Sequence, residues 1–428
     1  MLLGASLAGC ESWMGEDDKP PLPGERVAVL SYQRGLDVEA DSARIRLPRP
    51  FLNVNWPQTG GLPHHAMHHV DAGERLARAW TADVGRGSDE RHKLVSPPVV
   101  AGGKVFAIDA MSEVSATDAA TGARLWQARV VEDADLDGSF GGGLAYDDGR
   151  LFASTGSGEV VALNADTGAQ LWRRSVGAPL RGAPAVRGGR VVVQSVENQT
   201  QALAAADGRP LWRHTGISET ASLLGGSTPA IDGNVVVVAY SSGELFALRI
   251  ENGAPLWAES LAALRRTEGL SILTDVRGLP VIGGDRVYAL GNSDTLIAVD
   301  LRTGRRLWER EIGGTQTPWL AGEYLFVISN DQELMALEAG TGRIAWITAL
   351  QRWKDAKDRS GYVTWSGPVL AGDRLVVTGS NGWALAVSPY GGQVLGKEPL
   401  PEGVVTPPVV ADRSVYFLTE DAKLLAYR

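Results

Sequence analysis

Cysteine is almost absent from this sequence, since Cys10 is the single cysteine among 428 residues. One cysteine cannot form a disulfide within the chain, and it cannot supply the sulfur ligands of a four-cysteine zinc site. Both of these ways of stabilising a fold are therefore excluded. The use of Cys10 has to be sought in the residues around it.

Long apolar runs and an excess of positive charge are missing as well. No window of eighteen uncharged apolar residues occurs, so the sequence predicts no membrane-spanning helix. Lys and Arg number 41 against 50 Asp and Glu, which gives a formal net charge of -9 and argues against a nucleic-acid partner. The abundant residues are instead glycine (52) and tryptophan (13), which favour tight turns and large apolar anchors.

Motifs of nucleophilic, zinc-protease or phosphate-binding chemistry are not found either. The chain has no G-x-S-x-G, no H-E-x-x-H and no phosphate-binding loop. His92 and His214 each stand alone, and a lone histidine is usually not catalytic. We therefore predict no catalytic residues.

Two polar clusters resemble metal sites. The stretch HHAMHH holds His64, His65, His68 and His69, which as imidazoles could bind copper or nickel. The stretch DADLDG at 133–138 matches the opening of a calcium loop, but Leu144 stands where the twelfth-position glutamate is expected. We predict no metal at either cluster, and interpret them as a polar tether and an acidic surface loop.

The N-terminal segment gives Cys10 a use. Leu7-Ala8-Gly9-Cys10 resembles the bacterial lipobox, in which the cysteine becomes an acylated N-terminus. We therefore predict that residues 1–9 are the remnant of a signal peptide and that Cys10 carries palmitate. Glu11 follows where an aspartate would resemble an inner-membrane retention signal, which favours the outer membrane.

The next sixty residues are interpreted as a lipidated tether over 10–70. Its beginning, GEDDKPPLPGE, is acidic and proline-rich, so it cannot bury enough surface to fold alone. Its later part, NVNWPQTGGLPHHAMHHV, has Trp56 as its one large anchor. We expect this part to lie along the surface of the main domain.

From residue 71 onwards the chain repeats itself about every 40 to 50 residues. The repeated segment has the form A-x-D-x-x-T-G-x-x-x-W, as in AVDLRTGRRLW, where Asp300 and Gly304 form a turn and Trp308 follows. A seventh segment has Gly396 at the tryptophan position. The matching tryptophans, which we predict to fill the wedges between neighbouring units, are Trp126, Trp172, Trp212, Trp257, Trp308 and Trp346.

Each repeat also begins with two short β-branched segments joined by a glycine- or aspartate-containing turn, as in PPVVAGGKVFAID. Four short strands in such a length form one propeller blade. An eighth repeat stops at Arg428 after three strands, and the stretch RLARAWTADV with Trp80 can supply the fourth. We predict an all-β fold over 71–428: an eight-bladed β-propeller of four-stranded blades closed by an N-terminal strand, with a seven-bladed ring as the alternative.

The tryptophan repeat resembles that of the pyrroloquinoline-quinone (PQQ) propeller family. With the lipobox and the tether, the chain is similar to the BamB-like lipoproteins of the machinery that inserts β-barrel proteins into the outer membrane. The resemblance implies a non-enzymatic scaffold without a cofactor, anchored by its lipid and facing the periplasm. Its implied partners are the POTRA domains of BamA and nascent outer membrane proteins.

The resemblance also implies docking residues. An exposed leucine-arginine pair of that family matches Leu180 and Arg181, and a loop aspartate matches Asp275, although Arg277 stands where a second aspartate would be. Both segments join the last strand of one repeat to the first strand of the next. We therefore expect all three residues on one face of the ring, where loops form binding surfaces.

Two other functions remain open at this point. The first is a quinoprotein dehydrogenase, a class whose alcohol dehydrogenases use an adjacent cysteine pair and a calcium ion beside PQQ. The second is a periplasmic propeller that binds another protein partner, since a fold alone does not fix a function.

Overall fold

The computed structural model describes residues 36–39, 44–131, 141–219, 225–261 and 275–428. The chain divides into two units, Met1–Asp37 and Val38–Arg428, and all the strands belong to the second. Cys10 and the calcium-like stretch 133–138 lie outside the described residues. Among the described residues, no helix is long and apolar enough to cross a membrane.

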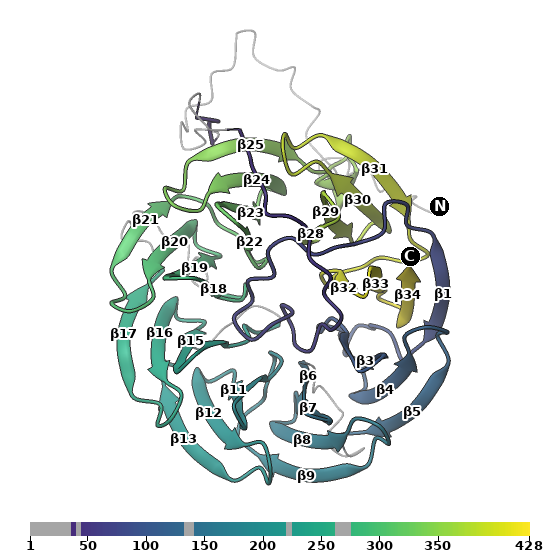
Figure 1. Ribbon diagram of the computed structural model, residues 1–428, viewed down its shortest axis with the longest axis vertical. Helices are drawn as coiled ribbons and strands as arrows, with labels where there is room; N and C mark the ends of the chain where they lie inside the picture. The colour runs from purple at the N-terminus through teal and green to yellow at the C-terminus, as the bar shows by residue number, and fades with distance from the viewer. Residues whose placement is uncertain (1–35, 40–43, 132–140, 220–224, 262–274) are drawn as a thin grey trace, which may run out of the picture. The chain divides into compact units, whose positions relative to one another are not determined.

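Eight four-stranded antiparallel sheets surround a central axis as the blades of a propeller (Figure 1). The first strands, which surround the axis, are β2 (Val99–Ala101), β6 (Gly142–Asp147), β10 (Ala185–Arg187), β14 (Ala230–Asp232), β18 (Val281–Gly283), β22 (Trp319–Ala321), β28 (Trp365–Ala371) and β32 (Val409–Ala411). The second strands are β3 (Lys104–Ile108), β7 (Arg150–Thr155), β11 (Arg190–Gln194), β15 (Val235–Ala239), β19 (Arg286–Gly291), β23 (Tyr324–Ile328), β29 (Arg374–Gly379) and β33 (Ser414–Leu418).

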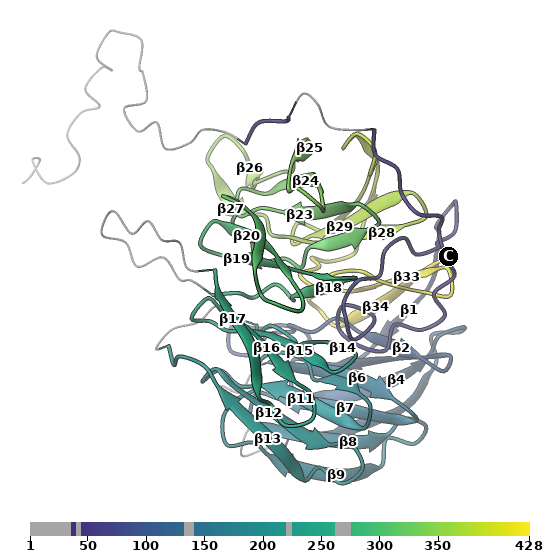
Figure 2. The same cartoon turned by 60° about the vertical axis from the view of Figure 1, so that its left-hand side comes forward.

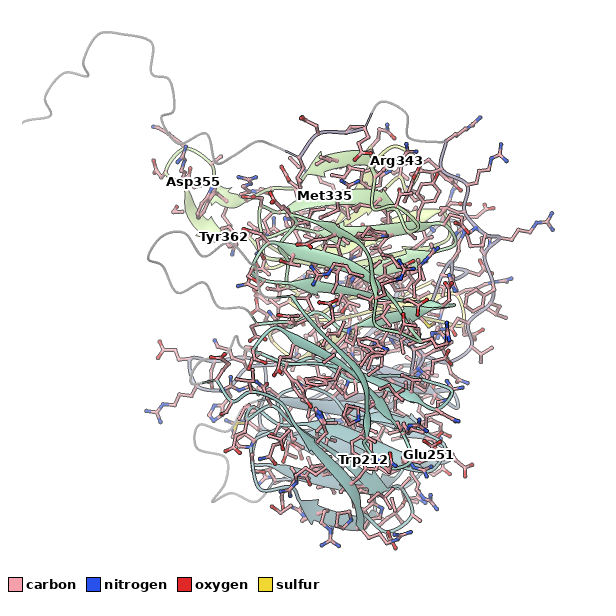
Figure 3. The ribbon with its side chains drawn as sticks, turned by 90° about the vertical axis from the view of Figure 1, so that its left-hand side faces the viewer. Trp212, Glu251, Met335, Arg343, Asp355 and Tyr362 are labelled. Carbon is pink, nitrogen blue, oxygen red and sulfur yellow. The ribbon has the colours of Figure 1, made fainter. Side chains whose placement is uncertain are left out.

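The third strands are β4 (Glu113–Asp118), β8 (Glu159–Asn164), β12 (Gln199–Ala204), β16 (Glu244–Arg249), β20 (Thr295–Asp300), β24 (Glu333–Glu338), β30 (Trp383–Val387) and β34 (Lys423–Tyr427). The outer strands are β5 (Arg124–Arg129), β9 (Gln170–Ser175), β13 (Pro210–Thr215), β17 (Pro255–Ser260), β21 (Arg306–Arg310), β25 (Ile344–Ala349), β31 (Val394–Pro399) and β1 (Arg78–Asp83). A two-stranded hairpin, β26 (Trp353–Asp355) and β27 (Ser360–Tyr362), projects from the ring (Figures 2 and 3).

Burial explains the sequence pattern of each strand class. The second and third strands are runs of Val, Leu, Ile and Ala that are buried on both faces, because every blade packs against two neighbours. The outer strands are more exposed, and β1 and β5 begin with two exposed residues and then alternate between half-buried and exposed ones. The hydrophobic core therefore continues around the ring from blade to blade.

The eighth blade is closed by the two ends of the propeller. Strand β1 pairs antiparallel with β34, and Ala77 and Arg428 exchange backbone hydrogen bonds of 2.8 and 2.9 Å. Lys423 and Asp83 add an ion pair at 2.5 Å. The prediction of eight blades closed by an N-terminal strand is confirmed, and the seven-bladed alternative is wrong.

The repeat tryptophans join neighbouring blades. Each indole N–H donates to a backbone carbonyl of the following blade, and the acceptors for Trp80, Trp126, Trp172, Trp212, Trp257, Trp308 and Trp346 are respectively Ala119, Ala165, Ala205, Ile250, Leu301, Ala339 and Pro389. Each ring also covers the positive-φ glycine of the next repeat, as Trp257 covers Gly304. The tryptophan and the glycine of the motif therefore form one contact between blades.

Residues 51–72, which we call the strap, cross the centre of the ring (Figure 1). The strap forms hydrogen bonds or β-bridges with the first strand, or with the turn that follows it, of all eight blades. The Gln58 side chain, for example, accepts from the Val186 N–H at 2.9 Å and donates to the Val186 carbonyl at 2.7 Å. Trp56 is 2% exposed, as expected of an anchor.

The later part of the predicted 10–70 tether was expected to lie along the surface of the main domain, and residues 51–70 pack more deeply than that. Met67 and Val70 are buried in the same core cluster as Trp56, and the Trp56 and Trp319 rings stack with centroids 6.1 Å apart. The polar groups of this segment form hydrogen bonds with the first strands and the turns that follow them. The segment therefore folds against the blades without needing a core of its own.

Candidate binding site at the central channel

The ring has two faces with different connections. Because consecutive strands are antiparallel, the connections between blades lie on one face, which we call the inter-blade face. The turns between first and second strands lie on the opposite face, which we call the turn face. The strap contacts such turns at Gly102, Gly322, Asp373 and Asp412, so it lies on the turn face.

Leu180 is not the exposed residue that the resemblance implies. It lies between β9 and β10, is 1% exposed and packs in the core between the second and third blades. Its backbone N–H donates to Thr155 at 3.1 Å, and it forms a β-bridge with Ser195. A leucine held in this way stabilises the connection and presents no surface to a partner.

Arg181 and Asp275 lie together on the inter-blade face. Arg181 is half-buried and Asp275 is buried, and both line one small cavity of about 30 Å³ between the third, fourth and fifth blades. Arg277 lies beside Asp275: burial lowers the pKa of its guanidinium, and the Asp275 carboxylate opposes that shift. The loops that carry the three residues therefore meet at one place.

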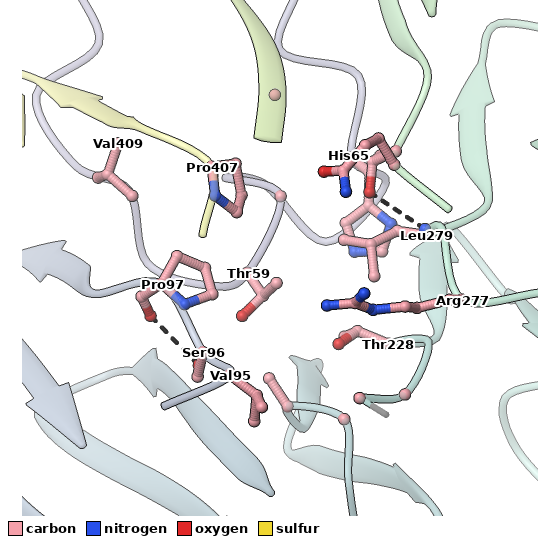
Figure 4. Close-up of a pocket in the computed structure, with 18 of the residues that line it drawn as sticks. Thr59, His65, Val95, Ser96, Pro97, Thr228, Arg277, Leu279, Pro407 and Val409 are labelled. Atoms are coloured by element: carbon pink, nitrogen blue, oxygen red, sulfur yellow. Dashed lines mark hydrogen bonds between the residues drawn. The ribbon is translucent and has the colours of Figure 1, made fainter. Parts of the chain in front are cut away.

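A second cavity, of about 110 Å³, occupies the central channel between the strap and the inter-blade face. Its strap side includes Trp56, Thr59 and His65, and its other walls include Arg181 and Arg277. Figure 4 shows Thr59, His65 and Arg277 around the cavity. Arg181 lines both cavities, so it links the docking loops to the channel.

The four histidines of HHAMHH hold the strap. His65 Nδ1 lies 2.8 Å from the Pro280 carbonyl, His69 Nδ1 lies 2.8 Å from the Pro48 carbonyl, and His69 Nε2 accepts from the Asp373 N–H at 3.0 Å. Burial lowers the pKa of His64, His65 and His68, which favours their neutral form. Among the described residues, no group of three or more His, Cys, Asp and Glu is arranged to hold a metal ion.

Sequence reasoning missed the channel residues. Thr59, Thr228 and Arg277 come from the strap and from two different blades, and no spacing in the sequence relates them. One signal of this site was present in the sequence: Arg277 is an arginine at the position where the resemblance implies an aspartate.

Comparison with known proteins gives one family. The family model described as outer membrane protein assembly factor BamB matches residues 110–348. BamB of Yersinia pestis is 26% identical over 55% of this chain, and BamB of Moranella endobia is 25% identical over 30%. These matches span 61% and 34% of the two relatives, so this chain covers less than two thirds of either.

Solved structures show the same fold. BamB from Moraxella catarrhalis superposes with a TM-score of 0.67 at 20% identity, over 83% of this chain and 100% of that one. Quinohemoprotein alcohol dehydrogenase from Comamonas testosteroni gives 0.68 at 14% identity, over 87% of this chain and 80% of that one. At these identities the likeness concerns the fold alone.

The channel residues do not fit PQQ with calcium. Calcium takes oxygen ligands, usually with several carboxylates, and none of the described residues lining the channel cavity is Asp or Glu. The single cysteine is residue 10, so no adjacent cysteine pair exists to lie against a quinone. The propeller fold is therefore shared with quinoproteins, but the described residues that line this channel do not supply carboxylate ligands for a calcium ion beside a quinone.

Proposed function

This chain belongs to the BamB family of outer membrane protein assembly factors, and from this premise we propose that it is a non-enzymatic scaffold that docks on BamA. The family match, which covers more than half of the chain, carries this proposal. The propeller offers a rigid ring with loops on one face, which suits a binding role. The scaffold would aid the insertion of nascent outer membrane proteins without changing them covalently.

The docking surface is assigned to the inter-blade face around Arg181 and Asp275. Arg181 is half-buried and lines the same small cavity as Asp275, and arginines are among the residues that often dominate the energy of protein interfaces. Leu180 is not part of this proposed docking surface, because its side chain is buried. The POTRA domains of BamA are the proposed partner, with acylated Cys10 holding the ring at the periplasmic side of the outer membrane.

Affinity purification from the cell envelope tests the proposal. The full chain carries a tag, and the variants are Arg181→Glu and, as a matched control, Arg209→Glu. Arg209 is exposed in the turn between β12 and β13, on the turn face. We expect the wild type and Arg209→Glu to recover BamA equally, and Arg181→Glu to recover about tenfold less. Failure of the wild type to recover BamA contradicts the function, whereas equal recovery by Arg181→Glu contradicts only the docking surface.

A further inference from the structure

The wall of the channel cavity is positively charged in an acidic protein. Its described lining contains Arg181 and Arg277 and neither Asp nor Glu, although the chain has a net charge of -9. A cavity of about 110 Å³ is several times larger than one water molecule requires, which is about 10–15 Å³. The charge and the volume together suit a small negatively charged molecule.

Arg277 directs its guanidinium into this cavity (Figure 4). Within the part of the chain that the structure describes, the guanidinium forms no hydrogen bond or ion pair, and Asp275 acts on it only through its charge. Gly225 leaves room for it, since a Cβ there would lie 2.9 Å from Arg277 Nε. Arg277 is half-buried, so a guanidinium that faces the cavity without a hydrogen-bonding partner presents its N–H donors to an oxyanion.

Other buried polar groups around the cavity also have no partner among the described residues. They are the Thr59 and Thr228 hydroxyls, His65 Nε2 and the Trp56 indole N–H. Thr228 is 1% exposed, and Figure 4 shows that Thr59, Thr228 and Arg277 line the same cavity. Buried polar groups are normally hydrogen-bonded, so a cluster of unpartnered ones at a cavity indicates something that binds there.

The protonation of His65 adds to this description. Its Nδ1 lies against the Pro280 carbonyl and therefore carries the proton, so Nε2 of the neutral ring is an acceptor. An acceptor requires a hydroxyl or an N–H from the bound molecule, whereas the Arg277 guanidinium requires an anion. One small molecule that has both an oxyanion and a hydroxyl group satisfies the two.

We propose that the central channel binds a small hydroxylated oxyanion, with its carboxylate or phosphate group on Arg277 and its hydroxyl groups facing Thr59, Thr228 and His65. Water alone can satisfy the threonine hydroxyls, but it adds no negative charge, and the one neighbouring carboxylate, that of Asp275, faces two guanidinium groups on the cavity wall. The proposal does not rest on BamA docking, because its test uses Arg277 and Thr228 in the purified chain without BamA.

Calorimetric titration of the purified full chain with a matched series of probes tests this site. The probes are glycerol 3-phosphate, glycerate and neutral glycerol, which separate phosphate from carboxylate and both from an uncharged polyol. We expect one molecule of at least one anion to bind per chain and glycerol not to bind. Arg277→Gln should weaken binding about tenfold or more, Arg277→Lys should retain part of it, and the exposed control Arg209→Gln should not change it.

The proposal is overturned if neither anion binds at about 10 mM, or if folded Arg277→Gln binds as tightly as the wild type. Circular dichroism and the melting temperature without probe establish that each variant is folded. If Arg277→Gln does not fold, Thr228→Val decides instead, since it removes one hydroxyl at nearly constant volume. We expect Thr228→Val to weaken binding about threefold or more, and unchanged affinity contradicts the site.

Discussion

The Trp212 indole lies directly on Gly253 of the next blade: a Cβ added to Gly253 would come within 2.5 Å of ring atom Cε3. The indole N–H donates to the Ile250 carbonyl at 2.8 Å from the same turn. Gly253 has a φ of 71°, in the left-handed region. The glycine of the motif is therefore required twice, once by the turn and once by the tryptophan of the preceding repeat.

Replacement of Gly253 should separate these two requirements. Gly253→Ala is expected to lower the free energy of unfolding by about 2–5 kcal/mol, because left-handed strain adds to overpacking against Trp212. Gly233→Ala is the matched control in the same blade: φ is 52° and nothing lies within 4 Å of the added Cβ. It should cost only about 1–2 kcal/mol. Urea denaturation measures the free energy of unfolding of both variants. Equal losses would contradict the contact between Gly253 and Trp212.

The strap should contribute to the stability of the ring as a core element does. Trp56→Ala is expected to cost about 3–5 kcal/mol, since it removes a buried indole that stacks on Trp319. Leu52→Ala, in the same segment but 49% exposed, should change the unfolding free energy by less than about 0.5 kcal/mol. A small change in the unfolding free energy of Trp56→Ala would contradict this prediction, because it would mean that the strap can detach while the blades keep their stability.

Leu180 should behave as a core residue. Leu180→Ala is expected to destabilise the protein by about 2–5 kcal/mol, whereas Leu171→Ala on the exposed side of β9 should be nearly neutral. At a temperature where both variants are fully folded, each should recover BamA as well as the wild type does. Loss of recovery by folded Leu180→Ala would show that the residue reaches the partner and contradict its assignment to the core.

The blades were predictable because their determinants are local. Each of the seven repeats carries its own turn glycine, and six of them carry the tryptophan, as in the Asp300–Trp308 segment, so the pattern is visible within eleven residues. The reason for Gly396 is not local. The eighth blade takes β1 from the start of the propeller, so it has no turn between its third and fourth strands for an indole to cover. Gly396 stands in the preceding blade, where a tryptophan would therefore lack that contact.

The strap and the channel were not predictable for the opposite reason. His69 Nε2 accepts from the Asp373 N–H, 304 residues further along the chain, and no periodicity relates such partners. A polar segment rich in Pro, Gly and His has the composition of a tether, and only the edges of the first strands turn it into a folded element. Likewise the sequence of a loop does not show which side chain faces the core, so Leu180 was placed on the surface.

Burial of His65 should make the stability of the protein depend on pH. Its pKa falls from 6.5 to about 4 in the folded protein, mainly through burial. Above pH 6.5 the ring is neutral in both states, and its full contribution is present. Between pH 6.5 and about 4 the unfolded chain binds a proton that the folded chain does not, so the free energy of unfolding should fall by up to about 1.4 kcal/mol per pH unit.

A comparison with His65→Gln isolates this contribution from other titrating groups. At pH 7.5 the difference in unfolding free energy between the two proteins reports the lost packing and the lost hydrogen bond to Pro280. As the pH falls to 4.5, the wild type should lose about 2–3 kcal/mol more than the variant, so the difference should shrink or change sign. Urea denaturation at half-unit steps of pH measures it. A difference that stays constant over this range would mean that His65 is protonated equally in the folded and unfolded states, contrary to the burial of its ring between the strap and the blades.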